Sequence, residues 1–279
     1  MRRFILNADD FGMTEAYNKA VLEGYSKGIL KSASICANGD AFEHAVDEII
    51  PKCEDLSVGV HLNIIEGRAL TNTKLLTDET GEFNNGYISI IKKSFCNDFL
   101  HEAESEFRAQ IEKIQSRTKV DHIDSHVHTH AIPNIFKIVV KLAKEYNIPY
   151  IRTQFEKPYL VPNFGKHFNT KYPVNILKII LLNSFTILNK KHIKNSGLKT
   201  NDYLIGVGYT GMMDSHTVEY GLKNLKSDFI AEALIHPCCY DEPVTDSHYY
   251  EFMITQNDNL KNKIESMGVS ITNHNFENK

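Results

Sequence analysis

The chain has 279 residues, of which 42% are hydrophobic and 24% are charged, and this composition is ordinary for a globular protein. Lysine and arginine total 31 against 35 aspartate and glutamate residues, which gives a formal net charge of −4 at pH 7. The composition excludes disorder as the main state. The mildly acidic balance argues against nucleic acid or an anionic membrane surface as a partner.

Neither a membrane segment nor a disulfide framework is predicted. The most apolar stretch, 174–188, contains a lysine and two asparagines and is shorter than the roughly 20 residues of a spanning helix. The five cysteines are odd in number and form no C-x-x-C pair, so we expect reduced thiols in a cytoplasmic protein. The opening segment MRRFILNADD has too short an apolar run for a signal peptide.

Short apolar runs alternate with helical periodicity along the chain. Strands are predicted over 3–8, 32–37, 56–62, 120–128, 148–152, 229–235 and 269–272. Helices are predicted over 15–27, 41–50, 99–116, from Pro133 onward, and over 174–190, 217–227 and 246–267. Thr14 fits the N-cap of the first helix and Gly28 fits its end.

Strands that alternate with helices predict parallel strands joined by helical crossovers. A β/α barrel and a doubly wound sheet both fit, and about seven strand–helix units favour the barrel. No G-x-G-x-x-G follows the first strand, so a dinucleotide site lacks its main support. We predict an α/β fold, a distorted β/α (TIM-like) barrel forming one domain over 1–279, with irregular or helical insertions near 66–98 and 156–228.

Residues able to carry chemistry gather at the carboxyl ends of the predicted strands, where β/α barrels build their active sites. Asp9 and Asp10 end the first strand, and His61 ends the strand over 56–62. The other candidates at strand ends are Asp124, His126, His128, His130, Arg152 and His236. Side chains from several strands are therefore expected to converge on one site.

The segment 124–130 reads DSHVHTH and alternates acidic or imidazole side chains with others. In an extended strand Asp124, His126 and His128 would point to one face, and His130 would join them only if the strand continued. Carboxylate and imidazole groups on one face are typical ligands of Zn²⁺, Mn²⁺ or Fe²⁺. The alternative is a histidine-rich edge that binds no metal.

Each of the other candidates also has a structural interpretation. Asp9 and Asp10 could simply end a strand, since aspartate is common in turns and at helix N-caps. In the catalytic interpretation one carboxylate binds a metal and the other stays free as a base. His61 and His236, taken alone, fit structural histidines. The remaining histidines without supporting neighbours are interpreted as surface or structural residues, at 44, 101, 167, 192, 216, 248 and 274.

Five segments of the chain occur in an order found in a known family. They are Asn7-Ala8-Asp9-Asp10-Phe11-Gly12, Gly59-Val60-His61-Leu62, Asp124-Ser125-His126-Val127-His128 with Pro133, Ile151-Arg152, and His236-Pro237. In these motifs the chain resembles the YdjC-like carbohydrate deacetylases, which include chitooligosaccharide deacetylases of the ChbG type. The resemblance covers roughly 3–155 and 230–240, and 156–228 contains no matching motif.

The resemblance implies a distorted β/α barrel similar to the polysaccharide deacetylases. Those enzymes remove an N-acetyl group from a sugar and use an Asp-His-His metal site. By position, the implied metal ligands in this chain are Asp10, His61 and His126. Asp9 is then the implied general base and His236 the implied general acid.

Three further residues are implied to support that site. Arg152 would orient the carboxylate pair, and His128 and Asp124 would contact the substrate or hold the ligands. The implied cofactor is one divalent metal ion. Two imidazoles and one carboxylate suit Zn²⁺, whereas proteins resembling this one are commonly described with Mg²⁺, so both ions stay open.

The implied substrate is an acetylated amino sugar or a small chitobiose-like oligosaccharide, with or without a 6-phosphate, from which acetate is released. Two alternatives stay open. One is a metal-dependent phosphoesterase or amidohydrolase, although in those enzymes the H-x-H pair usually lies on the first strand. The other is a sugar- or metal-binding barrel without catalysis. The apolar helix near 174–190 could form a homodimer interface or a lid.

Overall fold

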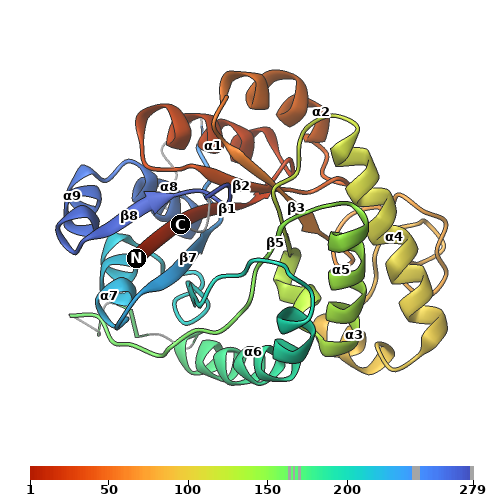
Figure 1. The fold of residues 1–279 in the computed structure, drawn as a ribbon. Coiled ribbons are helices and arrows are strands. Elements are labelled where there is room, and N and C mark those ends of the chain that lie inside the picture. Colours follow the sequence, from red (N-terminus) through yellow and green to blue (C-terminus); the bar gives the residue numbers. More distant parts are fainter. Residues whose placement is uncertain (163–164, 166, 169–170, 241–245, 277–279) are drawn as a thin grey trace.

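The computed structural model describes residues 1–162, 165, 167–168, 171–240 and 246–276. Within this part, parallel strands form a curled sheet in the order β5-β4-β3-β2-β1-β7-β6, with helices around its outside (Figure 1). The strands are β1 (Arg2–Phe11), β2 (Ser32–Ile35), β3 (Ser57–Leu62), β4 (His122–Ser125), β5 (Tyr150–Ile151), β6 (Tyr203–Ile205), β7 (Phe229–Ile235) and β8 (Val269–Thr272). β8 pairs with β1 over Arg2–Ile5. From Asn7 onward the same edge of β1 pairs with β2 instead.

The two outer strands of the sheet, β5 and β6, approach each other through neighbouring segments. The amide of Leu204 in β6 donates a hydrogen bond to the carbonyl of Phe155, just after β5, at 2.8 Å. The amide of Ile151 in β5 donates to the carbonyl of Lys199, before β6, at 3.0 Å. The sheet is therefore a distorted, incompletely paired barrel, as predicted. The doubly wound alternative is wrong, because it needs helices on both faces of an open sheet.

The helices largely follow the sequence pattern. They are α1 (Glu15–Lys27), α2 (Phe42–His44), α3 (Tyr87–Lys93), α4 (Asn97–Gln115), α5 (Pro133–Glu145), α6 (Lys171–Lys194), α7 (Ser215–Lys223), α8 (Ser247–Thr255) and α9 (Asp258–Ser266). Thr14 caps α1 as predicted, since its hydroxyl accepts a hydrogen bond from the amide of Tyr17 at 3.3 Å. The helix predicted over 41–50 is reduced to α2 followed by a π-helical turn over 45–49.

Three elements differ from the prediction. α3 and β6 lie in segments where the sequence shows no clear period. The prediction of a single helix over 246–267 is wrong, because the helix is interrupted between Thr255 and Asp258, where α8 ends and α9 begins. There the side chain of Asn257 accepts a hydrogen bond from the amide of Leu260 at 2.9 Å and caps α9. Asparagine favours such a cap over a helix interior, which explains the break.

β4 ends at Ser125, short of the predicted strand end at 128. Residues 126–131 form a 3₁₀-type turn in which Val127 and His128 have left-handed φ angles of 52° and 59°. Such angles are uncommon in residues other than glycine, and they strain the β-branched Val127. The prediction that Asp124, His126 and His128 share one extended face is therefore wrong.

The two predicted insertions contain ordered structure. In 66–98, backbone bridges join Arg68 to Glu82 and Thr77 to Phe83, and α3 follows. The segment 156–228 contains α6, β6 and α7. α6 has 24 residues and includes the apolar run. In the described part of the chain, no helix is both long and apolar enough to span a bilayer. No disulfide joins the five cysteines, all of which lie among the described residues.

Gly59 in β3 lets a buried histidine ring pack against the strand. A Cβ at this position would lie 2.2 Å from Nε2 of His122, whose ring is stacked on His274 with 3.6 Å between ring centroids. Because the ring of His122 is fully buried, it cannot move aside. We expect Gly59→Ala to lower the free energy of unfolding by about 1–3 kcal/mol, measured by urea denaturation.

Gly86→Ala is the matched control, because an added Cβ there meets nothing within 4 Å. Gly86 is the N-cap of α3, where alanine is less favourable than glycine, so a loss below about 1 kcal/mol is expected. Equal losses in the two variants would contradict the steric explanation.

Candidate active site

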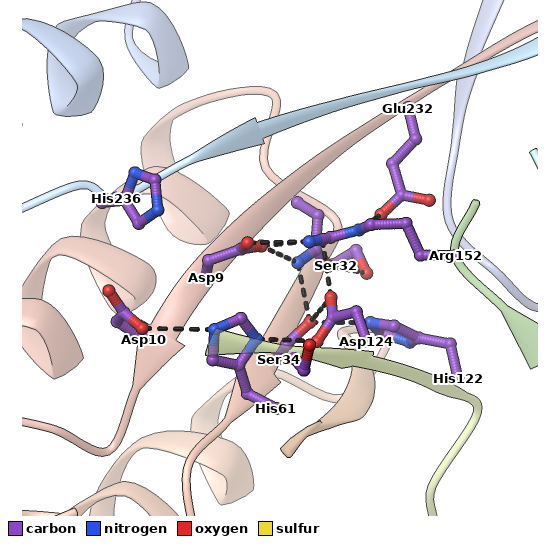
Figure 2. Close-up of polar contacts among 12 residues, drawn as sticks. Asp9, Asp10, Ser32, Ser34, His61, His122, Asp124, Arg152, Glu232 and His236 are labelled. Carbon is purple, nitrogen blue, oxygen red and sulfur yellow. Dashed lines mark hydrogen bonds and ion pairs between the residues drawn. The ribbon is translucent and has the colours of Figure 1, made fainter. Parts of the chain in front are cut away.

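The two aspartates at the end of β1 point in different directions (Figure 2). Asp9 continues the strand, whereas Asp10 has a left-handed φ of 62°, a conformation that aspartate tolerates better than most residues. The Asp9 carboxylate consequently turns toward Arg152 and the Asp10 carboxylate toward His61. The two acids therefore have separate environments, as the catalytic interpretation requires.

The Asp9 carboxylate is bound by both ends of a buried guanidinium. Nη1 and Nη2 of Arg152 donate to Oδ2 and Oδ1 of Asp9 at 2.7 Å each, and Nδ2 of Asn7 donates to Oδ1 at 2.8 Å. Burial by itself raises the pKa of Asp9, but the charge and hydrogen bonds of Arg152 outweigh it and hold this pKa well below its ordinary value. Asp9 is therefore ionised at neutral pH, and Oδ2 keeps a lone pair for a further proton donor.

Asp10, His61 and His126 form a compact group of metal-ligand type. Nδ1 of His126 lies 2.8 Å from Oδ1 of Asp10, and Nε2 of His61 lies 3.2 Å from the same oxygen. The other ring nitrogen of His61, Nδ1, lies 2.7 Å from Oδ1 of Asp124. In metal sites such a carboxylate fixes the orientation of the imidazole ligand. The donor set, with ligand atoms within 4.8 Å of one another, therefore fits one divalent cation.

The electrostatics of this group favour positive charge. Burial lowers the pKa of a histidine, but Asp124 and Asp10 together raise the pKa of His61 to about 10. Burial raises the pKa of Asp10, yet its hydrogen bonds with His126 and His61 hold it well below the ordinary value. A divalent ion at this place would replace the proton of His61, because a metal ligand must be deprotonated.

A second group, Asp9, His61 and Asp124, is also close enough to hold a cation. Its carboxylates are already paired with Arg152, whose Nη2 lies 2.6 Å from Oδ2 of Asp124. A metal ion placed there would be repelled by the guanidinium. The first group, with Asp10, is therefore the better candidate metal centre.

His236 follows β7 and faces a cavity that Asp9 and His126 also line. This cavity has a volume of about 470 Å³. Glu251 on α8 accepts a hydrogen bond from the backbone amide of His236, and its Oε2 lies 3.1 Å from the ring Nδ1. Burial would lower the pKa of His236, but Glu251 with the nearby aspartates raises it to about 9. The ring therefore carries a proton at neutral pH.

A family model described as YdjC-like protein matches residues 3–266 of the chain. The chain belongs to the YdjC-like family. A carbohydrate deacetylase of Clostridium beijerinckii is 40% identical over 149 residues, which cover 53% of this chain and 58% of that relative. A carbohydrate deacetylase of Geobacillus stearothermophilus is 33% identical over 178 residues, which cover 63% of this chain and 70% of the relative. The match thus spans less than two thirds of the first relative.

A solved structure confirms the fold of this YdjC-like chain. That solved protein is from Enterococcus faecalis and is described as a candidate cellobiose-phosphate cleavage protein. It superposes with a TM-score of 0.71 over 98% of this chain and 97% of its own, at 22% identity. The family model confirms the family resemblance read from the motifs, and the solved structure confirms the distorted β/α barrel. Specificity of the ChbG type stays a prediction.

The YdjC-like barrel brings the predicted site residues into one region. Asp124 connects the parts, because it contacts both His61 and Arg152. His128 lines the cavity, and its Nδ1 is buried with no hydrogen-bond partner among the described residues. His130, in contrast, is buried and bound to the Ser125 side chain and the Arg152 carbonyl, which is a structural role.

Sequence reasoning missed three polar residues around this site. Glu232 binds Nε of Arg152 at 2.6 Å, and its only signal in the sequence is an acid inside the apolar strand FIAEALI. Glu251 holds His236 but lies on another element, and no local pattern indicates it. His274 is buried, and its ring nitrogens lie 2.8 Å from Ser32 Oγ and 3.4 Å from Oε2 of Glu232.

Proposed function

We propose that this YdjC-like protein is a metal-dependent hydrolase that removes N-acetyl groups from amino sugars and releases acetate. The observation that carries the proposal is one cavity lined by an ionised carboxylate, Asp9, and a protonated imidazole, His236. Hydrolysis of an amide needs both a proton acceptor and a proton donor. The relatives named carbohydrate deacetylases support an acetylated sugar as the substrate.

In this proposal Asp10, His61 and His126 hold the divalent ion, either Zn²⁺ or Mg²⁺. When bound, the ion supplies Lewis-acid chemistry, which polarises an acyl carbonyl and lowers the pKa of water. Asp9 accepts the proton of the attacking water. His236 donates its proton to the amide nitrogen, because an amine anion is not a viable leaving group.

Other residues keep these groups in place. Arg152 orients Asp9 through two hydrogen bonds, and Asp124 orients His61. His128, which lines the cavity with an unpaired ring nitrogen, is proposed to contact the substrate. We further propose that 1–279 act as one catalytic domain and that a chitobiose-like sugar, with or without a 6-phosphate, is accepted.

Acetate release from N,N′-diacetylchitobiose, with and without its 6-phosphate, tests the proposal. Metal-stripped protein is expected to be inactive and to regain activity when Zn²⁺, Mg²⁺, Mn²⁺ or Co²⁺ is returned. His126→Ala removes one ligand and is expected to lower metal affinity by at least about 100-fold, measured by titration calorimetry, and to abolish turnover. His101→Ala, at an exposed histidine on α4, is the matched control and should behave as wild type.

Equal metal affinity and turnover in His126→Ala and wild type would contradict this assignment. Hydrolysis of an aryl phosphate without acetate release would favour the phosphoesterase alternative. Metal binding without turnover of any acetylated sugar would favour a binding barrel.

The pH profile should report the proton on His236. Its pKa is raised to about 9 against the opposing effect of burial, so the acid form is present at neutral pH and is lost as pH rises through about 9. Glu251→Gln removes the closest negative charge and should shift the alkaline limb of kcat down by about 1–2 pH units. The other titratable groups that act on the His236 ring remain in this variant: Asp9, Asp10, His128 and His248.

Glu265→Gln is the control for this experiment, since Glu265 is exposed on α9. Both variants are compared with wild type at one saturating metal concentration. An unchanged alkaline limb in Glu251→Gln would show that His236 does not set it.

A further inference from the structure

The cavity above the proposed catalytic residues has two chemically different parts. Its base carries Asp9, His126 and His236. Its walls are contributed by α3, by the turn over 126–131 and by α6, and most of their side chains are aliphatic. A cavity of about 470 Å³ is also much larger than an acetyl group requires. The walls therefore contact a part of the substrate other than the reacting amide.

The aliphatic side chains continue to the mouth of the cavity. Leu177 and Val174 on α6 are 66% and 53% exposed, and Ile88 on α3 is 61% exposed. Val127 is 47% exposed although its left-handed backbone is strained for a β-branched residue. Exposed apolar side chains that gather at one opening indicate a binding site, whereas scattered ones do not.

These walls are poorly suited to a sugar. Their polar side chains, apart from His126 at the base, are His128 at one end and Tyr87 and Lys178, and Thr210 lines the cavity beside them. The hydroxyl of Thr210 is already bonded to the carbonyls of Gly206 and Val207, at 3.1 and 3.0 Å. A sugar ring placed against Ile88, Val127, Val174 and Leu177 would exchange water for aliphatic carbon around its hydroxyl groups, at a cost that few hydrogen bonds would offset. A chitobiose-like sugar would therefore place its second ring toward His128 and leave this aliphatic part of the walls free.

We propose that the substrate of this site is an N-acyl amino sugar that carries an aliphatic chain, and that the chain lies along the walls formed by Ile88, Val127, Val174 and Leu177. This inference rests on the proposed deacetylation. The occupant is the substrate itself, because the aliphatic walls join directly onto Asp9, His126 and His236. The chain is attached either at the glycosidic oxygen or within the acyl group.

Binding to the full-length Asp9→Asn protein tests the proposal independently of turnover. Titration calorimetry compares hexyl with methyl N-acetyl-β-glucosaminide, and N-hexanoylglucosamine with N-acetylglucosamine. Because each pair of buried methylenes is worth about tenfold in affinity, we expect a Kd at least about tenfold lower for the longer compound of one pair. The pair that shows the preference identifies where the chain is attached.

Leu177→Gln should reduce that preference at least about threefold, because it places an amide in the wall. Ile187→Gln is the matched control: Ile187 is 59% exposed on the same helix and does not line the cavity. Sedimentation of both variants shows whether the apolar face of α6 is instead a contact between two copies of the chain.

Equal Kd values within both pairs would overturn the proposal. An undiminished preference for the longer compound in Leu177→Gln would also overturn it, since the aliphatic chain of the ligand would then bind elsewhere. A loss of dimers in both variants with no change in this preference would overturn it as well. Acetate release from the same compounds by the wild-type protein is measured in parallel. A lower Kd for the compound with the longer aliphatic chain, without acetate release from any compound, would refute the deacetylation but still support the apolar binding site.

Discussion

Asp9→Asn is expected to lower kcat for sugar N-deacetylation by about 10²–10⁴-fold and to leave metal affinity within about threefold of wild type. The substitution keeps the size of the side chain and removes the negative charge that accepts the proton. Asp9 contacts Arg152 and Asn7, whereas the candidate metal ligands converge on the neighbouring Asp10. Acetate release and titration calorimetry measure the two effects separately.

Asp10→Asn is the matched comparison at the adjacent position. It weakens one of the three metal ligands, so its defect should appear as lower metal affinity and should be reduced at high metal concentration. The two variants therefore separate the two roles of the acid pair. A tenfold or greater loss of metal affinity in Asp9→Asn would contradict this division and would favour the alternative group with His61 and Asp124.

That the candidate residues lie close together could be predicted, because topology brings strand ends together. In a parallel barrel every carboxyl end lies at one rim, so Asp9, His61 and His236 meet there although they are far apart in the sequence. Their residue types then suffice to suggest chemistry. Knowledge of the register was not needed to place these residues near one another, whereas their catalytic and metal-binding roles stay predictions.

The geometry of the histidine motif could not be predicted, because it depends on backbone angles that the residue types disfavour. Nothing in the letters DSHVHTH indicates left-handed φ at Val127 and His128. Alternation predicted a strand, and the actual turn separates His126 from His128. His126 still contacts Asp10 and so stays a candidate metal ligand, although the reasoning behind its orientation was wrong.

Residues that act on the site only through other residues could not be predicted either. Glu232 and His274 fill the barrel interior and reach the site through Arg152 and Ser32. Glu251 reaches it through His236. Such contacts join elements distant in the sequence, and a single chain carries no local pattern for them. They become visible only when the sheet order is known.

The largest effect on stability is expected from Arg152→Met. The guanidinium is fully buried and lies within 2.7 Å of oxygens of Asp9, Asp124 and Glu232. Removing it leaves three buried carboxylates without their shared cation, so we expect the free energy of unfolding to fall by about 3–5 kcal/mol. The chain has no tryptophan, so urea unfolding is followed by circular dichroism.

The pH dependence of this loss has a definite sign. Burial raises the pKa values of Asp9 and Glu232, but the charge of Arg152 holds both below their ordinary values. These groups therefore stabilise the fold above their unfolded pKa, and that contribution is lost as pH falls. Without the cation the buried acids protonate more readily. The difference between Arg152→Met and wild type should consequently be largest near pH 7 and smaller near pH 4.

Two further variants make this prediction decisive. Arg117→Met removes an exposed guanidinium paired with Glu43 and Asp47, and it should destabilise the fold far less than Arg152→Met, because water and salt screen a surface ion pair. Glu232→Gln keeps the shape of the buried network and removes one carboxylate, with an expected loss of about 1–3 kcal/mol, which is measurable even if Arg152→Met does not fold. Losses in Arg152→Met and Arg117→Met of equal size would mean that the buried network contributes no more than a surface ion pair. The ionised state of Asp9 would then need another explanation, because the cation that lowers its pKa is the one that these experiments remove.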